Sequence, residues 1–183
     1  MRWTLEEAAL PYRVQSVAFH ARSHLDRQPF AQVPFLADGD VHLFESGAIL
    51  LHLGEQNTAL LPRDAATRAQ AISWLFAALN SVEPDTAAWA FCHFRAEAFD
   101  ASVLAAFADR RDRRLHRMEA VLAGGEWLGE GFSIADIAMS DVLRLVDRLG
   151  GLGKYPACRD YVARASARPA FVKAYQDQLA HFS

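Results

Sequence analysis

The stretch Val33 to Leu50, VPFLADGDVHLFESGAIL, decides the fold of the first part of this chain. Two short runs within it, Val33 to Leu36 and Val41 to Phe44, have the composition of strands. The Asp38-Gly39-Asp40 segment between them is typical of a hairpin turn. A helix is then predicted from Ser46 to Gln56, because its apolar residues recur on one face. The stretch therefore predicts a strand, a turn, a second strand and a helix.

Glu45 and Ser46 stand side by side where the second strand ends and the helix begins. A helix N-terminus exposes unpaired N–H groups and the positive end of the helix dipole, so it favours a carboxylate ligand. The Ser46 hydroxyl can add one donor, and the Glu45 carboxylate can pair with an ammonium. This junction therefore suits the charged end of an amino acid. The alternative is that Ser46 is an ordinary N-cap that binds nothing.

The residues before this stretch also have mixed structure. Residues 2–10 show helix periodicity, and Tyr12 to Phe19 alternates like a strand. His20 to Gln32 is polar and irregular. The first part is therefore predicted to run helix, strand, irregular segment, two strands and helix, which is an α/β arrangement.

Asn57 to Asp64 is predicted to be a linker, since it contains a proline and turn residues and interrupts the pattern. Beyond it the sequence shows helix periodicity only. The helices predicted there are 65–94 with a bend near Pro84, 101–123, 133–149, 155–167 and 168–181. We therefore predict a chain of class α+β, with a small α/β domain at 1–56 and an all-helical domain at 65–183.

The bulk composition is that of an ordinary globular protein and argues against several classes of function. The 183 residues carry a net charge of −3, which gives no sign of nucleic-acid binding. No apolar run reaches the ~20 residues that a membrane span needs, and no signal peptide is visible. Cys92 and Cys158 form no disulfide framework, so a reducing cytoplasm is expected. His20 and His24 lack further ligands at metal spacing, so no metal site is expected.

Three segments together resemble the soluble glutathione transferase family, in the form found in bacteria. They are Val33-Pro34 opening a strand, Glu45-Ser46-Gly47-Ala48-Ile49 opening a helix, and Gly131-Phe132-Ser133-Ile134-Ala135-Asp136 opening a later helix. The EEAALPYRV segment at Glu6 to Val14 also resembles the family's first helix and the strand that follows it. The resemblance covers nearly the whole chain. It implies a thioredoxin-like domain at 1–56 and an all-helical domain at 65–183.

The resemblance also implies a glutathione site in the first domain. Glu45 and Ser46 would hold the γ-glutamyl group of glutathione. Val33-Pro34 would be a cis bond, and the Val33 backbone groups would pair with the cysteinyl residue. Gln32 either lines the same groove or is an exposed polar residue. Glutathione would act as a co-substrate, without a metal.

Ser133 and Asp136 are better explained by folding than by catalysis. Their S-x-x-D spacing is a variant of the capping box, in which each side chain bonds the backbone N–H of the other residue. A cap stabilises a helix by ~1 kcal/mol and accounts for both residues. Asp136 is therefore expected to be structural.

In the family, a first strand and the turn after it supply the serine, tyrosine or cysteine that acts on the glutathione thiol. This chain starts where the family's first helix is already under way, so we expect that strand and turn to be absent from residues 1–183. Two explanations remain open, an upstream segment that supplies them and a shortened, catalytically silent protein. The catalytic residue is unknown.

The implied function is addition of the glutathione thiol to a small hydrophobic electrophile, by a cytoplasmic homodimer with a role in detoxification. Trp89 to Phe94 is the candidate segment for the electrophile pocket between the domains. The alternative is a catalytically silent binding or regulatory module on the same scaffold. Neither a nucleic acid nor a membrane is expected as a partner.

Overall fold

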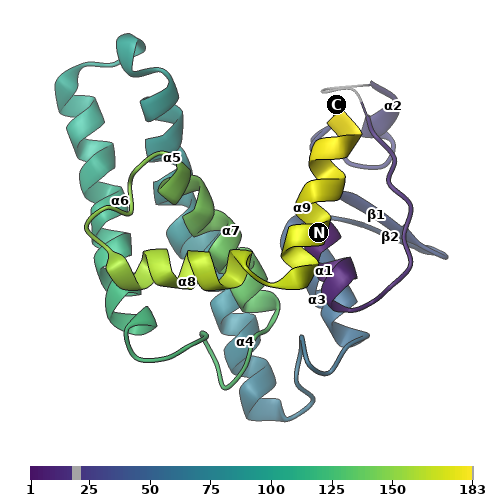
Figure 1. Cartoon of the computed structure of the whole chain (residues 1–183). Helices are drawn as coiled ribbons and strands as arrows, with labels where there is room; N and C mark the ends of the chain where they lie inside the picture. Colours follow the sequence, from purple (N-terminus) through teal and green to yellow (C-terminus); the bar gives the residue numbers. More distant parts are fainter. Residues whose placement is uncertain (18–21, 183) are drawn as a thin grey trace.

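The computed structural model describes residues 1–17 and 22–182 (Figure 1). The elements of the N-terminal part are α1 (Arg2–Glu7), α2 (Arg22–Leu25), β1 (Phe35–Asp38), β2 (Val41–Phe44) and α3 (Ser46–Glu55). The helices of the C-terminal part are α4 (Ala65–Ala77), η1 (Ala78–Val82), α5 (Glu83–Phe94), η2 (Ala96–Ala98), α6 (Ala101–Leu122), α7 (Ile134–Arg148), α8 (Pro156–Ser166) and α9 (Pro169–Phe182). No helix in the described ranges is long and apolar enough to cross a membrane.

The hairpin predicted from the sequence is confirmed. β1 and β2 pair antiparallel, with Phe35 opposite Phe44 at the open end. This register leaves Gly39-Asp40 as the loop, and Gly39 has φ +58°, a conformation that glycine adopts at little cost. β1 begins later than predicted, because Pro34 has no N–H to give to a strand ladder.

The strand predicted from Tyr12 to Phe19 is wrong for residues 12–17, which have no regular secondary structure. A strand needs a paired neighbour for its backbone groups, and no strand in the described part of the chain lies beside this segment. Tyr12 instead donates a hydrogen bond from its hydroxyl to Glu6 Oε1, 2.7 Å away. Residues 18 and 19 lie outside the described residues.

The long helix predicted from 65 to 94 is interrupted just before Pro84. The π-helical segment η1 separates α4 from α5 at this point. Pro84 has no N–H to donate to the preceding turn, and the wider π turn lies immediately before it. Leu79 of η1 and Glu83 at the start of α5 line a large cavity between the two parts of the chain.

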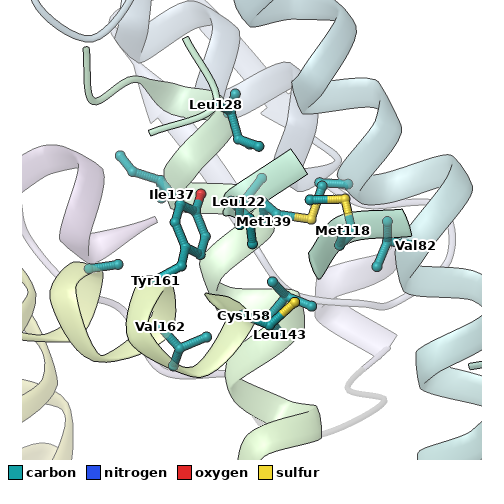
Figure 2. Packing of buried hydrophobic residues seen from close by; sticks show 14 of the residues in the cluster. Val82, Met118, Leu122, Leu128, Ile137, Met139, Leu143, Cys158, Tyr161 and Val162 are labelled. Atoms are coloured by element: carbon teal, nitrogen blue, oxygen red, sulfur yellow. The ribbon is translucent and has the colours of Figure 1, made fainter. Parts of the chain in front are cut away.

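The helix α7 is the central element of the C-terminal part. α4, α5 and α8 pack around it, and α6 packs on α5 and α8. Figure 2 shows part of the core that these helices enclose, in which Tyr161 of α8 and Met139 and Leu143 of α7 are fully buried. A second, smaller core joins α1 to α3 through the buried side chains of Leu5, Ile49 and Leu53.

The helix α9 returns to the N-terminal part and packs along α1 (Figure 1). Arg168, just before α9, donates hydrogen bonds to both carboxylate oxygens of Glu7, at 2.6 and 2.8 Å. The same guanidinium lies over the Phe132 ring, 3.7 Å from its centroid. Trp3 packs against both Phe132 and Phe171. These contacts fix α1 on the helical part.

Asp136 holds the start of α7. Its carboxylate accepts hydrogen bonds from the Ser133 N–H at 2.9 Å, the Leu128 N–H at 3.0 Å and the Tyr161 hydroxyl at 2.9 Å. Ser133 Oγ in turn accepts from the first turn of α7, so the Ser133–Asp136 capping box is present. Asp136 is completely buried, and burial raises the pKa of its carboxyl although these hydrogen bonds oppose the shift. The residue joins α7, α8 and the loop before α7.

Asp136→Ala would leave the Leu128 N–H, the Ser133 N–H and the Tyr161 hydroxyl without this acceptor. We expect the free energy of unfolding to fall by about 3 kcal/mol, because buried unpaired groups carry a desolvation cost. Urea unfolding followed by circular dichroism measures the loss. Asp109→Ala is the control, since the Asp109 side chain on α6 is 81% exposed.

A second variant keeps this test informative if the alanine variant does not fold. Tyr161→Phe removes one donor to Asp136 and should lower the free energy of unfolding by about 1 kcal/mol. If neither variant is less stable than the Asp109 control, the structural role of Asp136 is wrong.

Candidate functional site

A cavity of about 1260 Å³ lies between the N-terminal part and the helices α7 and α9. It follows α1 and the segment 11–17, passes Val33 and Pro34, and reaches the start of α3 at Ser46. Three of the five candidate glutathione residues therefore line one space. Gln32 and Glu45 are sequence neighbours of these three, but they are not among the described residues that line the cavity.

The Val33–Pro34 peptide bond is cis, as the resemblance implies, and Val33 is 61% exposed. Two buried polar side chains support the residue before it. Gln28 Oε1 accepts a hydrogen bond from the Gln32 N–H at 3.1 Å, and His24 Nε2 lies 2.6 Å from the Gln32 carbonyl oxygen. Because a carbonyl oxygen can only accept, His24 Nε2 carries the proton in this contact. The backbone of Gln32 is thus held in place, while the residue as a whole is exposed.

His24 and Gln28 were not candidate glutathione-site residues. They lie in the segment 20–32 that the sequence predicts as irregular, where the described residues form the single-turn helix α2. Isolated polar residues in a polar segment give no signal that they will be buried. No group of three His, Cys, Asp or Glu side chains suited to a metal occurs among the described residues, and His20 lies outside them.

Ser46 is the first residue of α3, and Glu45 is its N-cap. Ser46 therefore occupies the first helical position rather than the N-cap. Glu45 has φ +69°, a conformation that residues with a side chain rarely adopt, and its carboxylate makes no capping hydrogen bond. The N–H groups of the first turn thus have no side-chain cap from Glu45. Both residues are exposed beside the cavity.

Carboxylates from distant parts of the sequence gather near this helix end. Glu83 is an exposed residue, but partial loss of hydration raises the pKa of its carboxyl, and the negative charges of Asp141 and Glu45 raise it further. A positively charged ligand group placed among them would be attracted by the same charges. Glu83, the first residue of α5, was not predicted as a site residue, but it lines the cavity together with Ser46.

The hairpin is tied to α3 by a small polar cluster. His52 Nε2 lies 2.8 Å from Asp38 Oδ2, and Gln56 Nε2 donates to the same oxygen at 3.2 Å. Hydrogen bonds from His52 and Gln56 lower the pKa of Asp38. The cluster fixes the turn end of the hairpin against the helix that carries Ser46.

The prediction that Trp89 to Phe94 lines the electrophile pocket is wrong for this cavity. Trp89 is buried with the Arg111 guanidinium over its ring, 4.2 Å from the centroid. Phe91 and Phe94 are 53% and 64% exposed and are not among the cavity residues. The reason is that α5 packs against α6 and α7 and turns this segment away from α3.

Neither cysteine is placed to act as a nucleophile. Cys92 and Cys158 are both buried. Burial and the nearby Glu119 raise the pKa of the Cys158 thiol to about 12, so this thiol stays protonated at neutral pH. We therefore assign no catalytic residue.

Comparison with known proteins identifies the family. The model of the glutathione S-transferase N-terminal domain matches residues 1–55, and the model of the C-terminal domain matches residues 85–169. The disulfide-bond oxidoreductase YfcG of Escherichia coli (strain K12) is 31% identical over 91% of this chain and 84% of its own length. The chain belongs to the glutathione S-transferase family.

Other members of this glutathione S-transferase family are similarly related. The probable glutathione S-transferase GSTF2 of Oryza sativa subsp. japonica is 30% identical over 92% of this chain and 86% of its own length. A glutathione transferase structure from Pseudomonas putida, with one glutathione disulfide per subunit, has a TM-score of 0.87 and 28% identity over 94% of this chain and 84% of that one. A Burkholderia graminis structure with two glutathione molecules per subunit has a TM-score of 0.85 and 31% identity over 94% of this chain and 80% of that one.

These likenesses confirm the predicted fold class, a thioredoxin-like domain followed by the all-helical domain of the glutathione S-transferases. The thioredoxin-like part contributes the cis-proline loop and the start of α3 to the cavity. The helical part contributes α7, α9 and the segment around Glu83.

The raised pKa of Glu83 predicts how stability depends on pH. The folded state favours the protonated carboxyl. Below pH 4.5, the ordinary pKa of a glutamate, the carboxyl is protonated in both the folded and the unfolded state and does not destabilise the fold. As the pH rises through the raised folded-state pKa, the charged Glu83 destabilises the fold. Because Glu83 is exposed, solvent screening keeps the effect small. Glu83→Gln should have a slightly higher melting temperature than the unchanged protein at about pH 7, and the difference should vanish at about pH 4.

Thermal unfolding at both pH values measures this effect. Glu97→Gln is the matched control, since Glu97 is an exposed carboxylate of η2, and it should show no such pH-dependent gain. A gain for Glu83→Gln that is equal at both pH values would contradict the electrostatic explanation.

Proposed function

We propose that this protein binds glutathione in the cavity beside α3 and adds its thiol to a small hydrophobic electrophile. The observation that carries the proposal is that the cis Val33–Pro34 loop and Ser46 line one space. Glutathione or its disulfide occupies the similar structures from Pseudomonas putida and Burkholderia graminis.

Each candidate residue has a role that follows from its chemistry. The first turn of α3 and the Ser46 hydroxyl bind the α-carboxylate of the γ-glutamyl group. Glu45, with the negative charge of Glu83 behind it, attracts the α-ammonium. The exposed backbone of Val33 pairs with the cysteinyl residue, and Pro34 shapes the loop. Gln32 is exposed and does not line the cavity, so its role is limited to its held backbone, which positions the loop.

The opposite wall suits an apolar acceptor. Ile137, Ala138 and Val142 of α7 and Phe171 and Ala174 of α9 line it. In the proposed reaction the glutathione thiol loses its proton and its sulfur forms a bond to an electrophilic carbon. In a substitution the leaving group departs with its bonding electron pair, and in an addition the π-electron pair moves to the neighbouring atom, which takes up a proton. The residue that activates the thiol is not assigned.

A second activity has its own support. The Escherichia coli relative is a disulfide-bond oxidoreductase, and the Pseudomonas putida structure holds glutathione disulfide. Thiol–disulfide exchange with glutathione is therefore the second candidate reaction. A catalytically silent glutathione-binding module is the third outcome that the experiments distinguish.

We also propose that the protein works in the cytoplasm as a homodimer. Phe30, Phe91 and Phe94 are each more than half exposed, and such aromatic surface suits contact with a second copy. Light scattering on the purified protein distinguishes a dimer from a 20.3 kDa monomer.

Ser46→Ala should weaken glutathione binding about tenfold, because a hydrogen bond to the charged carboxylate is lost. Isothermal titration calorimetry with reduced glutathione measures the change. Ser102→Ala is the control, since Ser102 is an exposed serine in the first turn of α6. An unchanged affinity in Ser46→Ala would remove this residue from the proposed site.

Activity measurements separate the reactions. Conjugation of glutathione to a chloro-dinitrobenzene tests thiol addition, and glutathione-dependent reduction of hydroxyethyl disulfide tests exchange. We expect Ser46→Ala to lower kcat/KM for glutathione in whichever reaction occurs. Glutathione binding without either activity would support the silent module and overturn the transferase proposal.

A further inference from the structure

Arg144 has an arrangement that the proposed function does not use. It lies on α7, and its side chain lines the same cavity as Ser46. Its guanidinium carbon lies 5.4 Å from the centroid of the Phe171 ring and 5.8 Å from that of the Tyr175 ring, both on α9. The two rings are stacked, with centroids 5.8 Å apart and planes 11° apart. Contact with the rings fixes the plane of the guanidinium before any ligand arrives.

The hydrogen-bonding capacity of Arg144 is largely unused. A guanidinium has five N–H donors in a planar fork. Among the described residues, one bond is present, from Nη2 to Asp141 on the same helix. Nε is enclosed and has no hydrogen-bond partner there. The side chain is 26% exposed, so part of the fork can still be reached from the cavity.

The described charged side chains that line the cavity include one more basic residue than acidic residues. The charged side chains that line it, within the described ranges, are Arg2, Arg13, Arg27, Arg144, Asp38, Glu83 and Asp141. Asp38 is already bonded to His52 and Gln56. Asp141 is already paired with Arg144. Glu83 interacts electrostatically with Glu45 at the start of α3. The ammonium of a bound amino acid is therefore expected at the α3 end of the cavity.

We propose that Arg144 binds a carboxylate on the molecule that reacts with glutathione. The preferred acceptor is then an apolar or aromatic compound with a carboxylate, its body against the α7 and α9 wall and its acid on the guanidinium. This inference rests on the proposed glutathione site and narrows the substrate class of the same cavity. The carboxylate can belong to the small acceptor itself or to a second glutathionyl unit.

A plain i,i+3 ion pair with Asp141 is the competing explanation. Such a pair contributes little stability at a surface, and it would not change the affinity for ligands that enter the cavity. The two explanations differ in what they predict for ligands, because only a binding residue distinguishes a carboxylate from a neutral group of the same shape.

Two matched ligands test the proposal, S-(para-carboxybenzyl)glutathione and S-(para-carbamoylbenzyl)glutathione. Both carry the same glutathionyl part, so the ratio of their dissociation constants reports on the acceptor end alone. Calorimetry should show that Arg144→Gln lowers the preference for the carboxylate about tenfold, with the affinity for reduced glutathione unchanged. Arg144→Lys, which keeps the charge but loses the fork, should lie between the two.

Two further variants control for charge and structure. Arg148→Gln removes the same charge from the exposed end of α7 and should leave the preference unchanged. Asp141→Asn frees the Arg144 fork and removes a nearby negative charge, so the preference for the carboxylate should increase. If Arg144→Gln affects both conjugates equally and also leaves the affinity for glutathione disulfide unchanged, or if Arg148→Gln has the same effect as Arg144→Gln, the proposal is wrong.

Failure of the glutathione site is distinguished from failure of this inference. If neither conjugate binds, the proposed function is wrong. Arg144 is then tested without glutathione, by comparing the binding of phenylacetate with that of the neutral phenylacetamide. Equal affinity of the unchanged protein and Arg144→Gln for phenylacetate would then overturn the inference. An effect of Arg144→Gln on glutathione disulfide, but not on the carboxybenzyl conjugate, would assign the carboxylate to a second glutathionyl unit.

Discussion

The buried carboxylate of Asp136 determines where α7 begins, and the rest of the structure is arranged around α7. It accepts hydrogen bonds from the loop before the helix, from the helix start and from Tyr161 of α8. Burying a charge without such partners would be costly, so the bonds and the burial have to occur together. The same helix packs against α3 and α4 and carries Arg144 into the cavity. A folding contact therefore sets the geometry of the functional wall.

The position of α3 depends on this arrangement in a second way. A Cβ at Gly54 would lie 2.9 Å from Ile134 Cγ2 and 3.1 Å from Leu61 Cβ, so only glycine lets α3 approach the start of α7 so closely. At the other end of α3, Glu45 adopts a positive φ and leaves the first turn without a side-chain cap. The helix thus packs closely against α7 near its C-terminal end and has no side-chain cap at the end that borders the cavity. Stability and the proposed binding would use opposite ends of one helix.

Local patterns were enough to predict part of this structure. The hairpin around Gly39, the helix from Ser46 and the capping box of Ser133 and Asp136 each depend on residues within a few positions of one another. The strand predicted from Tyr12 does not form in residues 12–17, because a strand needs a distant pairing partner that an alternating pattern does not reveal. The prediction that Trp89 to Phe94 lines the electrophile pocket is wrong for this cavity, because helical spacing shows that a face is apolar but not what that face packs against.

The two sides of the cavity differ in how far a sequence can predict them. The proposed glutathione side uses backbone groups and one helix end, which depend on a short stretch of sequence. The acceptor side uses individual side chains of α7 and α9, such as Arg144 and Phe171, which meet only after the chain has folded. Changes in these side chains can alter the preferred acceptor while the loop at Val33–Pro34 and the start of α3 stay the same. Family membership therefore constrains the shared substrate more strongly than the partner with which it reacts.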